Sequence, residues 1–220
     1  WLIATGPASY AALVQYQYTG VIQSIEWLSP GPNADGSDIL ASYGIVIGAQ
    51  ASGAYTVDTS TPDFNASPDI GVYLLAADPV RYTFGGLTVD TGEGGNASGT
   101  SRMDVRVNTG VGDLWAVTSN LDFDAPEFNT SIFSLILQQS DGGVLDNDGL
   151  VQALPFDQFG PFGVPGGSTG AETILSVAGV GSVLVRAELT SHTLVPVPAA
   201  AWLFASALIG LSVFSRRRSA

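Results

Sequence analysis

Residues 13–26 read LVQYQYTGVIQSIE, and apolar and polar side chains alternate along this stretch. The apolar and aromatic members of the alternation are Val14, Tyr16, Tyr18 and Ile22. The polar members on the opposite face of an extended chain are Gln15, Gln17 and Thr19. Because successive side chains of a strand point to opposite faces, this period of two predicts a β-strand with one buried face.

The same alternation returns at residues 182–193, where Val183, Val185, Ala187 and Leu189 share one face. Residues 43–58 are expected to form two strands, one at 45–47 and one at 54–57. Further strands are predicted around residues 72–74, 80–84, 87–89, 103–107, 114–117 and 132–137. Turn-forming glycine, proline and aspartate separate these stretches, and no helical period occurs before residue 198. The sequence predicts one all-β domain at residues 12–193, an antiparallel β-sandwich or jelly roll.

The amino-acid composition limits the kinds of molecule that the protein can bind. The chain has 220 residues, with 7 Lys+Arg against 20 Asp+Glu, a formal net charge of -13. Such an acidic protein repels nucleic acid, so we expect no nucleic-acid partner, whereas divalent cations and neutral sugars are compatible with it. The absence of cysteine excludes disulfides, thiolate-bound zinc and a thiol nucleophile.

Residues 195–220 differ from the rest of the chain and fall into three zones. Pro196 and Pro198 favour an extended entry. The uncharged apolar run at 199–214 predicts a single transmembrane helix, since it covers about 25 Å. The cluster Arg216, Arg217 and Arg218 then stays cytoplasmic. A buried core helix is the alternative, but it gives no reason for the arginines after a segment that is apolar all round.

The residues Val195-Pro196-Val197-Pro198, the following Trp202 and the arginine cluster together resemble the PEP-CTERM sorting signal of Gram-negative bacteria. Val197 stands where that signal carries its glutamate. The resemblance implies an exosortase as partner, anchoring in the inner membrane through the helix, and then transfer to the cell surface or the extracellular matrix. Residues 55–63 (YTVDTSTPD) also resemble a segment found in the bodies of PEP-CTERM proteins, which implies a β-sandwich of unassigned activity.

Residues 1–11 are expected to be a signal-peptide remnant. An apolar stub is followed by Gly6 and small residues, and Ser9 and Ala11 suit positions −3 and −1 of a cleavage site. The mature chain would then begin near Ala12 or Leu13. An ordinary first strand is the alternative interpretation.

The residue types argue against catalysis. His192 is the only histidine and lies three residues before the sorting signal, where we expect a membrane-proximal stalk. A catalytic histidine needs a cleft and an orienting carboxylate. With no cysteine and no lysine either, we predict that the chain is not an enzyme.

Two acidic loops are candidate calcium sites, because calcium prefers carboxylate and carbonyl oxygens. The first loop contains Asp58, Asp63 and Asp69, and the second contains Asp141, Asp146 and Asp148. The alternative is that each aspartate caps its own turn by accepting hydrogen bonds from nearby backbone N–H groups. No other cofactor is predicted.

The sequence therefore favours an exported surface or matrix protein with a structural or adhesive role, associated with exopolysaccharide or biofilm and capable of self-association. A carbohydrate-binding module is the first alternative, with Trp27, Trp115 and the tyrosines as a sugar-stacking platform or, equally, as core residues. A secreted glycan hydrolase built on two carboxylates is the second alternative.

Overall fold

The fold is described from a computed structural model. The structure describes residues 13–30, 36–65, 67–75, 80–90, 101–109, 112–121, 127–145, 147–149, 154–160 and 169–195. The predicted signal-peptide remnant at 1–11, the predicted helix at 199–214 and the arginine cluster lie outside these residues. Neither helix of the described part has the length and apolar character that crossing a membrane requires.

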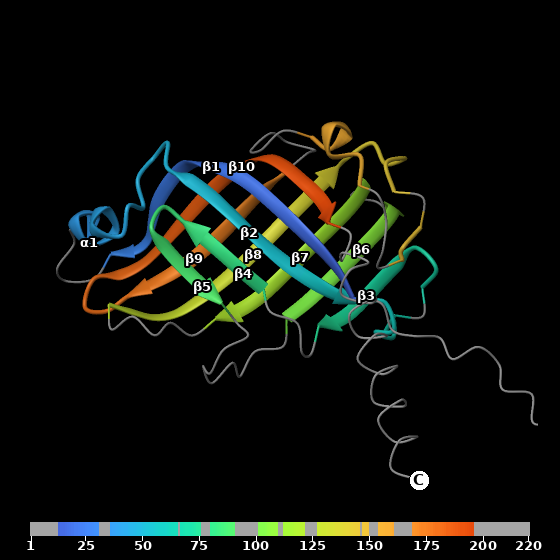
Figure 1. Ribbon diagram of the computed structural model, residues 1–220, viewed down its shortest axis with the longest axis horizontal. Helices are drawn as coiled ribbons and strands as arrows, with labels where there is room; N and C mark the ends of the chain where they lie inside the picture. The colour runs from blue at the N-terminus through green and yellow to red at the C-terminus, as the bar shows by residue number, and fades with distance from the viewer. Residues whose placement is uncertain are drawn as a thin grey trace, which may run out of the picture.

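The described part of the chain is built from β-strands that pair antiparallel throughout (Figure 1). The strands are β1 (Leu13–Pro30), β2 (Gln50–Asp58), β3 (Ile70–Leu75), β4 (Val80–Phe84), β5 (Leu87–Asp90), β6 (Ser101–Thr109), β7 (Gly112–Leu121), β8 (Phe128–Gln139), β9 (Gly170–Val177) and β10 (Gly181–Val195). The helical elements are the short α1 (Ser37–Ser42) and the 3₁₀ turn η1 (Phe156–Gln158). The prediction of an all-β antiparallel fold is confirmed.

These strands form one sheet, in the order β3-β6-β7-β8-β9-β10-β1-β2-β4-β5. Side chains from strands far apart in this order nevertheless touch in the core: the Tyr82 ring of β4 stacks on Phe133 of β8, with centroids 4.7 Å apart. The sheet therefore curls over until its two halves pack face to face. The predicted sandwich of two sheets is corrected in this respect, because a single hydrogen-bonded sheet supplies both layers.

The longest strands, β1 and β10, pair side by side in the middle of the sheet and allow it to bend. Their register shifts at Thr19/Gly20, Ile22/Ser24 and Trp27/Ser29. Irregularities of this kind increase the local twist and bend a strand pair. The buried face predicted for residues 13–26 is confirmed, since Tyr16, Tyr18 and Ile22 all belong to the core.

One expectation about the strands was wrong, and one strand was missed. Residues 45–47 form turns rather than a strand, because Gly44 and Gly48 on either side take positive φ values of 68° and 87°. Ile45 enters the core, whereas Ile47 is 68% exposed. Strand β9 was not predicted, and its inward-facing positions include the small or polar Ala171 and Thr173, which give a weak apolar period.

Candidate functional site

A network of buried rings lies between the two halves of the sheet. The indole Nε1–H of Trp115 on β7 donates a hydrogen bond to the hydroxyl of Tyr55 on β2, at 2.8 Å. The same hydroxyl lies 2.9 Å from Nε2 of His192 on β10. The Tyr16 ring stacks on Tyr55 and on His192, with centroids 5.1 and 5.3 Å apart. The network thus joins four strands through groups that are all shielded from water.

The expectation that His192 lies on an exposed stalk was wrong, because the residue is only 4% exposed and sits opposite Tyr18 in the sheet. When the Tyr55 hydroxyl donates to Nε2, the imidazole proton is on Nδ1, which is buried without a hydrogen-bond partner in the described structure. Burial lowers the pKa of His192 to about 4, so the ring is neutral at pH 7. No carboxylate among the described residues contacts it. The arrangement is that of a core histidine.

In the first acidic loop, the carboxylate of Asp58 caps a turn. Oδ1 of Asp58 accepts hydrogen bonds from the Ser60 hydroxyl at 2.7 Å and from the Ser60 N–H at 2.8 Å, and these bonds lower the pKa of Asp58. Asp69 contributes a backbone carbonyl to the N–H of Val107. In the part of the chain that the structure describes, no group of three or more Asp, Glu, His or Cys residues is arranged to hold a metal ion.

Asp63 has a more specific role, because it covers the free edge of β3. Its Oδ1 accepts the N–H groups of Asn65 and Val72, each at 2.8 Å. The Phe64 N–H donates to the Val72 carbonyl, also at 2.8 Å. The N–H and the carbonyl of Val72, which face away from β6, therefore both have hydrogen-bond partners. An edge strand without such cover is a template for pairing with another chain.

In the second acidic loop, Asp141 accepts a hydrogen bond from the Ser140 hydroxyl, and the backbone carbonyl of Asp148 accepts one from the Tyr73 hydroxyl. Asp146 lies outside the described residues. A calcium site in this loop therefore stays a prediction. A neighbouring acid that was not predicted, Asp113, is fully buried and accepts the N–H groups of Val144 and Leu145.

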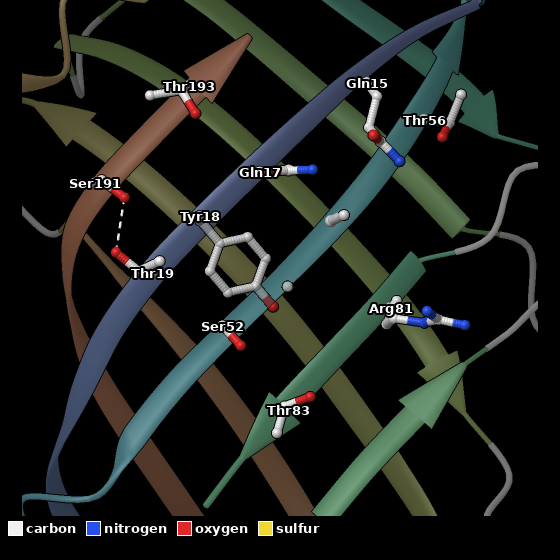
Figure 2. A pocket seen from close by; sticks show the side chains of 12 residues that line it. Gln15, Gln17, Tyr18, Thr19, Ser52, Thr56, Arg81, Thr83, Ser191 and Thr193 are labelled. Atoms are coloured by element: carbon white, nitrogen blue, oxygen red, sulfur yellow. Dashed lines mark hydrogen bonds between the residues drawn. The ribbon is translucent and has the colours of Figure 1, made fainter. Parts of the chain in front are cut away.

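The outer face of the sheet carries a groove of about 640 Å³ over β10, β1, β2 and β4, which we call the polar groove (Figure 2). Its lining is Gln15, Gln17, Tyr18, Thr19, Ser52, Gly53, Ala54, Thr56, Arg81, Thr83, Ser191 and Thr193. Arg81 is the one charged residue among these described lining residues, and none of them is a carboxylate. Amides and hydroxyls predominate on an otherwise acidic protein.

The sequence predicted some of the residues that line this groove, but not the groove itself. The alternation in residues 13–26 identifies Gln15 and Gln17 as outward-facing, but it does not reveal that β2, β4 and β10 flank them. The predicted aromatic platform is not at this surface: Trp115 is buried in the core, and Trp27 packs against the core from its margin. Comparison with protein-family models, curated proteins and solved structures finds no match to this chain.

The burial of His192 predicts acid sensitivity. The unfolded histidine takes up a proton near its usual pKa of 6.5, whereas the folded one resists protonation until about pH 4. Stability from this residue is therefore complete above pH 6.5 and is lost as the pH falls toward 4, by about 3 kcal/mol in total. His192→Phe keeps an aromatic ring but does not titrate. Denaturant unfolding of both proteins from pH 7.5 to 4 should show this additional loss only in the wild type; parallel curves would contradict it.

The capping role of Asp63 predicts that Asp63→Ala lowers the free energy of unfolding by about 1 kcal/mol, because two backbone N–H groups lose their acceptor. The exposed β3 edge should also cause self-association that increases with concentration. Asp63→Asn is the matched control, since it keeps an acceptor oxygen and should stay monodisperse by analytical ultracentrifugation. A rise in Tm with calcium that Asp63→Asn abolishes would instead show a metal ligand.

Proposed function

We propose that this chain is an exported protein of a Gram-negative bacterium, which an exosortase sorts to the cell surface or the extracellular matrix. There its β domain has a structural or adhesive role associated with exopolysaccharide. The observation that carries the proposal is the order of zones after Val195: prolines, an uncharged apolar run and then Arg216, Arg217 and Arg218. Before sorting, the apolar run would anchor the protein in the inner membrane.

The fold is compatible with this order. Strand β10 ends at Val195, the first residue of the resemblance, and Val195 is opposite Gln15 in the sheet. The last described strand therefore reaches the first residue of the proposed signal. The acidic composition and the absence of lysine support a role away from nucleic acid and anionic lipid.

A role in structure or binding is also favoured by the position of His192. It is the one side chain of the sequence suited to general acid–base work near neutral pH without a large pKa shift, and it lies in the core with no carboxylate beside it. The hydrolase alternative would have to rely on carboxylates alone. In the adhesive role, copies of the chain could associate through the edges of the sheet. Asp63 covers part of the β3 edge.

The proposal predicts processing of the tail. In a host that has an exosortase, the mature protein should reach the surface without residues 216–218, as measured by mass spectrometry of the C-terminal peptide. Replacing both Pro196 and Pro198 by alanine, or deleting the exosortase gene, should leave the full-length chain in the inner-membrane fraction. Ser176→Leu, on strand β9 and outside the proposed signal, is the control and should be processed like the wild type. A surface protein that keeps Arg216 to Arg218 would contradict the proposal.

A further inference from the structure

We propose that the polar groove binds a neutral oligosaccharide segment along the outer face of β10, β1, β2 and β4. The polar groove would then be the surface through which the protein adheres. The inference rests on the proposed function only for the source of the glycan, which would be the exopolysaccharide of the matrix. The binding itself is a property of the folded domain and can be measured without sorting.

The strand register arranges the lining residues in rows across the sheet. One row runs through Thr193, Gln17, Ala54 and Arg81, and the next runs through Ser191, Thr19, Ser52 and Thr83. Neighbouring strands are about 4.8 Å apart, so polar groups recur along each row at intervals comparable with the length of a sugar ring. Figure 2 shows the labelled side chains of these rows on the neighbouring strands that line the polar groove.

Ala54 accounts for the depth of the groove. It has the smallest outward-facing side chain of its row and lies between Gln17 and Arg81, which are both long and exposed. The inward-facing neighbour, Gly53, cannot carry a side chain, because an added Cβ would lie 2.4 Å from the Arg81 carbonyl oxygen. The Tyr18 hydroxyl occupies the space next to Gly53 on the inner side of the sheet, so this ring is not a stacking surface for a ligand.

The hydrogen-bonding capacity of the groove is largely uncommitted. Thr19 bonds Ser191 and Thr190, and Thr83 bonds Thr88. The side chains that make no hydrogen bond to other described residues are Gln15, Gln17, Ser52, Thr56 and Thr193. Each of these amides and hydroxyls both donates and accepts, as each hydroxyl of a sugar does. A polyol can therefore satisfy them in a way that a purely accepting or purely donating ligand cannot.

Charge selects among possible ligands. A bound divalent cation would find no carboxylate in the described lining and would lack the charged oxygen ligands that it prefers. A polyanion would meet a single arginine on a protein of net charge -13. A neutral chain of sugar rings meets neither obstacle. With no exposed aromatic ring in the lining, binding should depend on hydrogen bonds and be insensitive to salt.

The test uses the purified full-length chain in detergent and measures binding by isothermal titration. The neutral probes are cellohexaose, maltohexaose and laminarihexaose, and the anionic probe is a hexamer of uronic acid. We expect saturable binding of at least one neutral hexamer. Ala54→Leu fills the hollow and Gln15→Ala/Gln17→Ala removes its amides, so each should weaken that binding about tenfold or more. Ser176→Leu on the outward face of β9 is the matched control and should bind normally.

The substituted side chains lie on the outer face of the sheet, so we expect all variants to remain folded. Melting curves of each variant check this. Binding by no neutral hexamer, preference for the uronic acid hexamer, or equal binding by Ala54→Leu and Ser176→Leu would each overturn the proposal. Failure here would leave the sorting proposal intact, because tail processing is read in cells. Conversely, failure of processing would leave a measured affinity unchanged.

Discussion

The rest of the structure depends on the two halves of the sheet meeting face to face, and the hydrogen bond between the Trp115 indole and the Tyr55 hydroxyl joins them. Strands β7 and β2 are not neighbours, and β8, β9, β10 and β1 separate them within the sheet. The bond can form only because the sheet curls until its two halves meet. Together with the stacking of Tyr82 on Phe133, it fixes how closely they approach. A buried donor left without its acceptor costs about 1–3 kcal/mol, which is a large part of the stability of a domain.

The curl also determines the division between core and surface. The described inner face of the sheet is packed mainly with apolar and aromatic side chains, and the one histidine of the chain is buried there with its pKa lowered. The outer face carries the polar groove, while Asp63 covers part of the β3 edge. The groove is open to solvent, whereas the Asp63 cap keeps part of the β3 edge from pairing with another chain.

Local pattern located most of the strands, although it missed β9 and wrongly predicted one at residues 45–47, and it did not reveal how the strands are arranged. The alternation at residues 13–26 predicts which side chains of β1 are buried, because the period of a strand is a property of the strand alone. It says nothing of the contact between Tyr55 and Trp115, which are 60 residues apart. For the same reason the burial of His192 was not predicted. The residue is close to the tail in sequence but lies in the core. At residues 45–47 the apolar composition was misleading, because flanking glycines with positive φ set the backbone.

The features of the candidate site likewise differ in how far the sequence alone could predict them. Aspartate in a turn-rich loop predicts either a cap or a metal ligand, and only the positions of the Ser60, Asn65 and Val72 N–H groups favour the cap. The amides of β1 could be seen in the sequence, but the groove needs four strands in register. The proposed sorting signal, by contrast, is a linear feature and can be read without the fold.

A double-mutant cycle tests most directly whether the two halves of the sheet are fastened through the ring network. Tyr55→Phe, Trp115→Phe and the double variant are compared with the wild type by denaturant unfolding. The described geometry predicts a coupling free energy of about 1 kcal/mol or more, because either change alone breaks the same buried hydrogen bond. Additive effects of the two substitutions, with no coupling, would contradict it.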